Sequence, residues 1–401
     1  MTLPFLPALA VMLIGAKTSG ALSRRIGLPA VFGELVTGLI VGPALLGWVV
    51  PDQSLSDMAE LGVLVLMFLA GLETDLPQLR SVGRDATLVA TGGVLLPMAA
   101  GVGLGYLAGL GLAPSLFAGA ILTATSVSIS AQVLWQLGHL NSREGQTILA
   151  AAVIDDVLGV IVLTMVIGLS RGTEVLLPFG KMAAFFGLAV FIGRYVIPAF
   201  VERVHHRLSS DATIAIVLAM ALGSSWLASE LGGVAGITGA YLVGVFFGQT
   251  HLRGKPLGSI TELGFGFLIP LFFVSVGMAV RPSDLSSAPI FTILLSVTAI
   301  VTKVVGCFLG GTMGRMQLKP ALQVSLGMVA RGEVALVIAA IGLKDGLIDP
   351  SLYSASVVMT LVTTLVTPLL LKFGFGNAPQ LASPEEVLPP LEAAMIGEGE
   401  D

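Results

Sequence analysis

The amino-acid sequence predicts an all-α polytopic membrane protein with about thirteen transmembrane helices. Of its 401 residues, 55% are hydrophobic and only 11% are charged, whereas a soluble domain carries about 25% charged residues. The mean hydropathy is +0.95. The chain also contains 50 glycines, and small residues let membrane helices approach one another closely. These three observations exclude a globular enzyme held by a single anchor.

Hydropathy and turn residues divide the chain into thirteen expected spans. A helix rises about 1.5 Å per residue, so about 20 apolar residues cross a hydrocarbon core of about 30 Å. The first apolar run lacks the basic start of a signal peptide and is expected to remain as a span. The approximate limits are 3–22, 29–49, 57–74, 86–111, 114–138, 146–169, 175–200, 211–231, 234–250, 258–280, 287–312, 320–343 and 351–373.

The basic residues of the loops predict the orientation of these spans. Loops on one side of the membrane carry twelve basic residues, namely Arg24, Arg25, Arg80, Arg84, Arg143, Arg203, Arg207, Arg253, Lys255, Arg315, Lys319 and Lys372. The other side carries three, namely Arg171, Arg281 and Lys344. Cytoplasmic loops are enriched in Lys and Arg. We therefore expect an external N-terminus and a cytoplasmic C-terminus.

The order of the spans predicts two inverted repeats of six helices each. The span at 175–200 would link the halves, and the stretch LVTGLIVG at 35–42 is echoed by ITGAYLVG at 237–244. Transporters built from inverted repeats bind their substrate near mid-membrane, where the halves meet. The tail at 377–401 is rich in Pro, Ala and Glu and is expected to be disordered. We expect no cofactor, no nucleic-acid partner and no soluble nucleotide-binding domain.

Two adjacent carboxylates, Asp155 and Asp156, lie halfway along the span at 146–169. Placing one such group at the centre of a bilayer costs a few kcal/mol. A chain that keeps two of them there is expected to bind a cation, a proton, or each in turn.

A lysine, Lys303, lies in the middle of the span at 287–312. A mid-membrane lysine requires a partner, and the aspartate pair is the expected one. Because a buried lysine can lose its proton, Lys303 is a candidate proton carrier as well as a counter-ion. A purely structural ion pair is the alternative.

Two further spans carry polar groups at membrane depth. The stretch TATSVSIS at 123–130 has five hydroxyl residues in eight. It predicts an unwound helix whose carbonyls and hydroxyls help to bind a cation, although these side chains also bond back to the preceding helical turn. Arg331 and Glu333 are two residues apart and point to different sides of a regular helix. We expect them to neutralise the dipole ends of a broken helix, with a direct part in transport as the alternative.

Together these stretches resemble the cation/proton antiporter superfamily, in particular its second class of bacterial sodium/proton antiporters (NapA-like), over about residues 3–373. Each stretch alone is a weak signal, but their order and spacing make the set specific. The matching stretches are VFGELVTGLIVGPALLG (31–47), ELGVLVLMFLAGLET (60–74), TATSVSISAQVL (123–134), AAVIDDVLGVIVL (151–163), the span of Lys303 and ARGEVALVIAAIGLK (330–344).

The resemblance implies a homodimer in the bacterial inner membrane, whose core domain moves like an elevator against a dimerisation domain. The implied core helices are at about 57–169 and 258–373. The implied dimerisation helices are at about 3–49 and 211–250, with a linker helix at about 175–200. Two broken helices would cross at mid-membrane in the spans that contain residues 123–130 and Arg331.

The resemblance also implies roles for single residues. Asp156 matches the ion-binding aspartate of the family, and Asp155 matches the acidic residue that pairs with the lysine matching Lys303. Ser126, with Thr125 beside it, matches the unwound region near the ion. Sodium is therefore expected at Asp156, Asp155 and Ser126.

The expected function is exchange of cytoplasmic sodium or lithium for external protons, with a part in pH homeostasis. Potassium-transporting relatives usually differ at the aspartate pair, but potassium/proton exchange stays open as an alternative. An inverted-repeat anion symporter is disfavoured by the acidic residues at mid-depth, and a channel is disfavoured by coupled titratable groups. No nucleophile–base pair or metal-ligand spacing suggests an enzyme.

Overall fold

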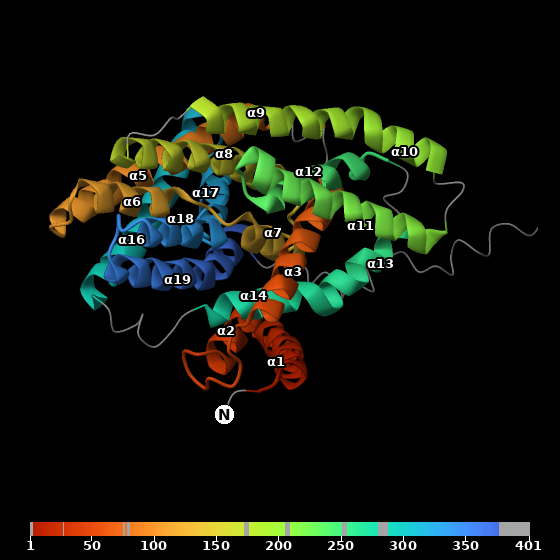
Figure 1. Ribbon diagram of the computed structural model, residues 1–401, viewed down its shortest axis with the longest axis horizontal. Coiled ribbons are helices and arrows are strands. Elements are labelled where there is room, and N and C mark those ends of the chain that lie inside the picture. The colour runs from red at the N-terminus through yellow and green to blue at the C-terminus, as the bar shows by residue number, and fades with distance from the viewer. Residues whose placement is uncertain are drawn as a thin grey trace, which may run out of the picture.

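A computed structural model describes residues 3–26, 28–74, 77, 81–171, 176–204, 209–250, 255–279 and 288–376. Within these ranges every regular element is a helix, so the expected all-α class is confirmed (Figure 1). The tail at 377–401, which we expect to be disordered, lies outside the described residues.

The helices follow the expected spans closely. Within the described ranges, ten apolar helical stretches are long enough to cross a membrane, and three shorter apolar helices lie at Ala30–Val41, Gly236–Gly248 and Val334–Leu343. The total of thirteen crossings stays a prediction. The α-helices are α1 (Phe5–Arg25), α2 (Ala30–Val41), α3 (Gln53–Glu73), α5 (Gly83–Leu107), α6 (Leu112–Thr123), α7 (Val127–Gln136), α8 (Arg143–Arg171), α9 (Leu176–Phe191), α10 (Ile197–Val204), α11 (Ser210–Leu227), α12 (Gly236–Gly248), α13 (Lys255–Leu263), α14 (Ile269–Met278), α16 (Pro289–Met313), α17 (Leu318–Gly327), α18 (Glu333–Lys344) and α19 (Pro350–Phe375). The π-helices are η1 (Ile192–Val196), η2 (Ala228–Gly232) and η4 (Gly264–Leu268).

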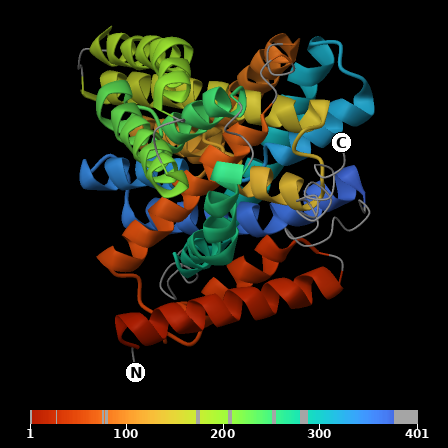
Figure 2. The same cartoon turned by 90° about the vertical axis from the view of Figure 1, so that its right-hand side faces the viewer.

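The helices pack in two groups (Figures 1 and 2). The core group consists of α5 to α8 and α16 to α19, and the scaffold group consists of α1, α2, α3, α11, α12 and α14. The expected division placed the spans at 57–74 and 258–280 with the core. In the structure, α3 packs along α12 and α14, and α14 packs along α2, so both belong by contact to the scaffold group.

Glycines determine how closely helices approach within each group. In the core group, a Cβ atom on Gly92 of α5 would lie 2.2 Å from the carbonyl oxygen of Gly306 on α16. In the scaffold group, a Cβ atom on Gly71 of α3 would lie 2.2 Å from the carbonyl oxygen of Tyr241 on α12. Because small residues permit such backbone contacts, α5 and α16 touch along their length and can share polar groups.

Two broken helices cross inside the core group, as the family resemblance implies. The first breaks between α6 and α7, and the second between α17 and α18. At the crossing the Ser126 backbone N–H donates to the Ala330 carbonyl at 2.8 Å, and the Ser130 hydroxyl donates to the Gly327 carbonyl. Gly332 permits this approach, because a Cβ atom there would lie 2.7 Å from the Ser126 side chain.

The contact between α5 and α16 can be tested with two alanine substitutions in α5. We expect Gly92→Ala to lower the midpoint of thermal unfolding in detergent, because overpacking costs about 1–3 kcal/mol. Gly103→Ala is the matched control, since a Cβ atom at Gly103 meets no atom within 4 Å. Size-exclusion chromatography after heating would measure both midpoints, and equal midpoints would contradict the proposed close contact.

Candidate ion-binding site

The Lys303 side chain is completely buried within the core group. Its Nζ donates to Asp155 Oδ1 at 2.9 Å, to the Gly93 carbonyl at 2.8 Å and to the Thr123 carbonyl at 2.9 Å. An ammonium group has three donors, so these three acceptors satisfy it. Thr123 is the last residue of α6, so Lys303 also offsets the negative end of that half-helix.

Asp156 is directed toward the scaffold group. The Thr238 hydroxyl of α12 donates to Asp156 Oδ2 at 2.9 Å. Both side chains line a small cavity of about 10 Å³, together with Val127 at the start of α7. The positive end of α7 and the carboxylate therefore face the same space. We did not predict Thr238 from the sequence, where its stretch appeared only as an echo between the repeats.

Thr125 and Ser126 lie in the extended link between α6 and α7, and both are buried. The Ser126 and Ser128 hydroxyl oxygens are 3.0 Å apart. Ser126 lines a large cavity, described below, rather than the small cavity at Asp156. The structure thus gathers the predicted residues around one crossing, but Ser126 and Asp156 line two different cavities.

Arg331 is fully buried in the link between α17 and α18. Its guanidinium makes long contacts, at 3.5 Å from Nη1 to Thr125 Oγ1 and at 3.4 Å from Nη2 to the Ala299 carbonyl. Glu333 is the first residue of α18, where a negative charge would favour the helix dipole, but its side chain lies outside the described part of the structure. The role of both residues in neutralising the dipoles stays a prediction.

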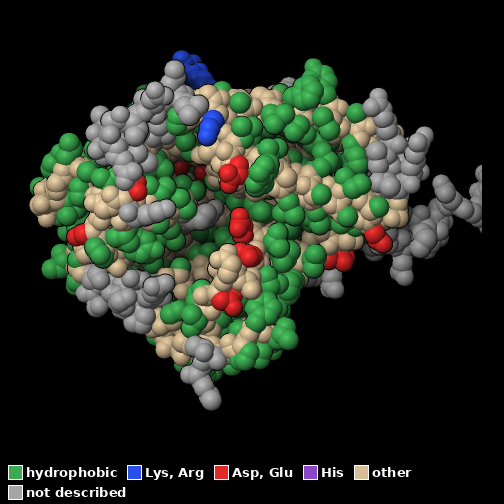
Figure 3. All heavy atoms as spheres, in the orientation of Figure 1, with side chains coloured by type: hydrophobic (Ala, Val, Ile, Leu, Met, Phe, Trp, Pro, Cys, Tyr) green, Lys and Arg blue, Asp and Glu red, His purple; other side chains and the backbone are tan. Residues whose placement is uncertain are grey.

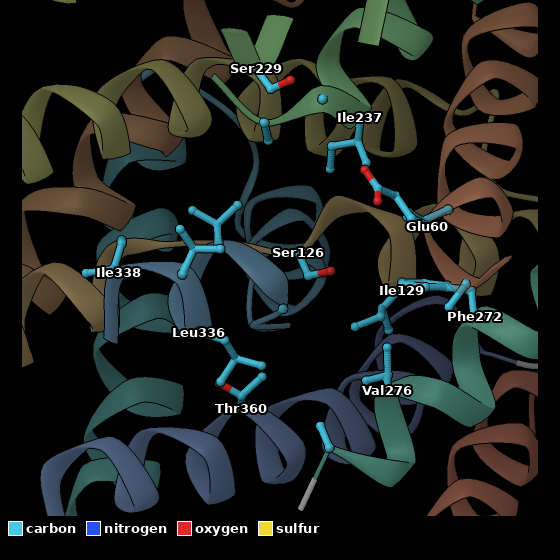
Figure 4. A pocket seen from close by; sticks show the side chains of 18 of the residues that line it. Glu60, Ser126, Ile129, Ser229, Ile237, Phe272, Val276, Leu336, Ile338 and Thr360 are labelled. Carbon is cyan, nitrogen blue, oxygen red and sulfur yellow. The ribbon is translucent and has the colours of Figure 1, made fainter. Parts of the chain in front are cut away.

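The large cavity has a volume of about 620 Å³ and lies between the core and scaffold groups (Figure 4). Most of its lining is apolar, with Glu60 of α3 and the hydroxyls of Ser126 and Thr360 among its polar groups. Figure 3 shows acidic side chains bordering a hollow near the middle of the face that Figure 1 presents to the viewer. The cavity reaches both links of the crossing, at Ser126 and Gly332.

One residue belongs to the lining of both this cavity and the small cavity at Asp156. Ile237 of α12 lines both the large cavity and the small one, and it is labelled at the cavity wall in Figure 4. Ile237 and Thr238 are neighbours in sequence, so the start of α12 both lines the two spaces and contacts the carboxylate.

The far end of α7 is fixed to the scaffold group. The Ala30 backbone N–H donates to Gln136 Oε1 at 2.6 Å. The rings of Trp135 and Phe265 meet edge to face at a centroid distance of 4.8 Å. Lys17 of α1 donates to the Phe265 carbonyl at 2.6 Å. The two groups are therefore joined at the end of α7, whereas near its start the large cavity lies between them and the bond from Thr238 to Asp156 crosses the boundary.

A helical membrane fold with two crossed broken helices and buried charges at the crossing defines a secondary transporter. The family described as "Sodium/hydrogen exchanger, transmembrane" matches residues 9–374. The chain belongs to this family, and its predicted resemblance to the cation/proton antiporter superfamily is confirmed. It is a multi-pass membrane protein and a monovalent cation/proton antiporter, not an enzyme.

Similar proteins cover nearly the whole chain. The Na(+)/H(+)-K(+) antiporter GerN of Bacillus cereus is 36% identical over 94% of this chain and 97% of its own length. The Na(+)/H(+) antiporter of Enterococcus hirae is 37% identical over 92% of this chain and 97% of its own length. The fold is similar to that of the sodium proton antiporter MjNhaP1 of Methanocaldococcus jannaschii, with a TM-score of 0.73 at 19% identity over 92% of this chain and 94% of that one.

A double-mutant cycle can test the buried pair of Asp155 and Lys303. Lys303→Gln leaves a buried carboxylate without its cation, and Asp155→Asn leaves a buried ammonium without its anion. Breaking one side of such a pair costs about 3–5 kcal/mol. We expect each single variant to lower the thermal midpoint in detergent by several degrees, and the double variant to lose clearly less than the sum. Strictly additive losses would contradict the coupling.

Proposed function

We propose that the chain exchanges cytoplasmic Na⁺ or Li⁺ for external protons, and that Asp156 binds either the cation or the proton. One observation carries this proposal. Of two adjacent buried carboxylates, Asp155 accepts from Lys303 within the core group, whereas Asp156 accepts from Thr238 across the boundary between the core and scaffold groups. In this state Asp155 is paired with its counter-ion, and Asp156 is placed where its ligand can change.

Competition at Asp156 accounts for exchange. A carboxylate carried across a bilayer without a counter-charge is costly, so the core crosses readily only when Asp156 holds a proton or a cation. Oxygen ligands suit a hard cation, and Asp155, the Ser126 hydroxyl and the link beside Thr125 supply them. The same core returns in either loaded state, so inward proton movement drives outward movement of sodium.

The packing supports an elevator-like motion of the core group against the scaffold group. The two groups touch at few places, and the 620 Å³ cavity lies between them. With the N-terminus outside and the chain in a bacterial inner membrane, the cavity faces outward and the contacts of Gln136 and Trp135 lie on the cytoplasmic side. We further propose that the scaffold group carries the homodimer interface.

Potassium is the second candidate cation. One relative with 36% identity over 94% of this chain is named as an Na(+)/H(+)-K(+) antiporter, so its name includes potassium beside sodium. The aspartate pair favours sodium and lithium in this chain. Proton movement in proteoliposomes, with each of the three cations added separately, distinguishes the two functions: a response to potassium alone would reassign the chain.

We expect Asp156→Asn to abolish cation-driven proton movement, because an amide carries no charge for either ligand to neutralise. Fluorescence dequenching of a pH dye in proteoliposomes measures this directly. Asp57→Asn is the control, since Asp57 is an exposed acid that bonds to Gln53 one turn away. Full sodium-driven proton movement in Asp156→Asn would remove Asp156 from the mechanism.

We expect Lys303→Gln to make transport electroneutral if Lys303 releases its proton during each cycle. In that case two protons exchange for one sodium in the wild type, and the cycle moves net charge. Transport rates at imposed membrane potentials would be measured for both proteins. An active variant with the voltage dependence of the wild type would show that Lys303 only pairs with Asp155.

A further inference from the structure

We propose that Thr238 is a positioning residue that competes with both the cation and the proton for Asp156, and thereby holds the unloaded core on the scaffold. The inference rests on the proposed role of Asp156. One hydroxyl group of the scaffold would then couple ligand binding at Asp156 to movement of the core group.

The contact crosses the boundary between the two groups. Thr238 belongs to α12 of the scaffold group and Asp156 to α8 of the core group. The two side chains are 2% and 9% exposed, respectively, so water replaces their hydrogen bond poorly. Hydrogen bonds to an ionised carboxylate are about twice as strong as those between neutral groups. The bond at 2.9 Å therefore stabilises an anionic Asp156 in this position of the core.

The space beside the pair is small. The cavity of about 10 Å³ is lined mainly by apolar side chains, and the titratable group that lines it beside Asp156 is Tyr241 of α12, whose hydroxyl lies 3.2 Å from that of Thr74. A cavity of this size holds about one water molecule. A hydrated cation does not fit there while the Thr238 hydroxyl stays bonded. Ile237, the residue before Thr238, lines both this space and the large cavity. A cation that keeps part of its water shell at Asp156 therefore displaces the Thr238 hydroxyl.

A proton on Asp156 Oδ2 weakens the same bond, because the neutral oxygen accepts less strongly from the hydroxyl than the carboxylate does. The empty, ionised Asp156 is therefore bound to the scaffold through Thr238. When Asp156 holds a cation or a proton, this bond is lost or weakened, and the core group can move. An exchanger requires this difference, since crossing of the empty core would dissipate the gradient.

This competition makes a quantitative prediction. If sodium and the proton each bind at the cost of the bond from Thr238 to Asp156, removing the Thr238 hydroxyl increases the affinity of Asp156 for both by the same factor. One charge-assisted bond accounts for about tenfold, or about 1.4 kcal/mol. At acidic pH the proton and sodium compete for Asp156, so the increases in affinity for sodium and for the proton cancel and the KM for sodium is unchanged. At alkaline pH only the gain for sodium remains, so the KM falls about tenfold. The pH above which the KM levels off rises by about one unit.

The test measures sodium-driven proton movement in proteoliposomes across the pH range for wild type, Thr238→Val and Thr238→Ser. Valine has nearly the same shape as threonine but lacks the hydroxyl, so we expect the altered dependence of KM on pH in Thr238→Val. Serine keeps the hydroxyl and should restore the wild-type profile. Thr238→Ala, which also lacks the hydroxyl, should match valine and serves if the valine variant does not fold.

Thr37→Val is the matched control. Thr37 precedes Gly38 as Thr238 precedes Gly239, and it is 4% exposed. Its hydroxyl bonds to the Gly15 carbonyl at 3.1 Å and lies 2.6 Å from the Ser19 hydroxyl, both within the scaffold group. We expect this variant to keep the wild-type dependence of KM on pH.

Two results would overturn the proposal. A KM raised at every pH in Thr238→Val would make Thr238 a ligand of the bound cation rather than its competitor. A lower turnover with an unchanged KM profile would make it a packing residue. A wild type without cation-driven proton movement would instead refute the proposed function, so the two failures are distinguishable.

Discussion

The arrangement of this protein depends on the need to satisfy one ammonium group inside an apolar helical bundle. Lys303 has no access to water, so its three donors must find acceptors from the chain. One is a carboxylate, and two are backbone carbonyls, at Gly93 and Thr123. The Thr123 carbonyl is available because α6 ends at that residue, so the break in the helix and the buried lysine support each other.

The same constraint divides the two neighbouring aspartates. Asp155 is held by Lys303, and consecutive residues of a helix point in different directions, so Asp156 cannot share that partner in the same way. It turns instead to α12 and to the positive end of α7. A pair that looks redundant in sequence thus has two distinct environments, and only one of them spans the boundary between the groups.

Features that follow from local pattern could be predicted from the sequence. The apolar runs predict the spans, and the two polar stretches predict the breaks at 123–130 and near Arg331. That Lys303 pairs with one of the two aspartates follows from the cost of a lone charge in lipid, and the family resemblance implies that Asp155 is the one. Thr238 could not be predicted, because a single threonine in an apolar span has no periodic signal. The allocation of α3 and α14 to the scaffold depends on glycine contacts between distant segments, such as Gly71 against α12, which hydropathy does not report.

The depth of the large cavity also determines where electrical work is done. A recess of about 620 Å³ that reaches Ser126 brings the solution on its side of the membrane toward the middle of the bilayer. The transmembrane potential then falls mainly across the thin layer between this recess and the opposite face. One elementary charge crossing 100 mV corresponds to about 2.3 kcal/mol. A displacement of the core much shorter than the membrane thickness would therefore capture most of that energy.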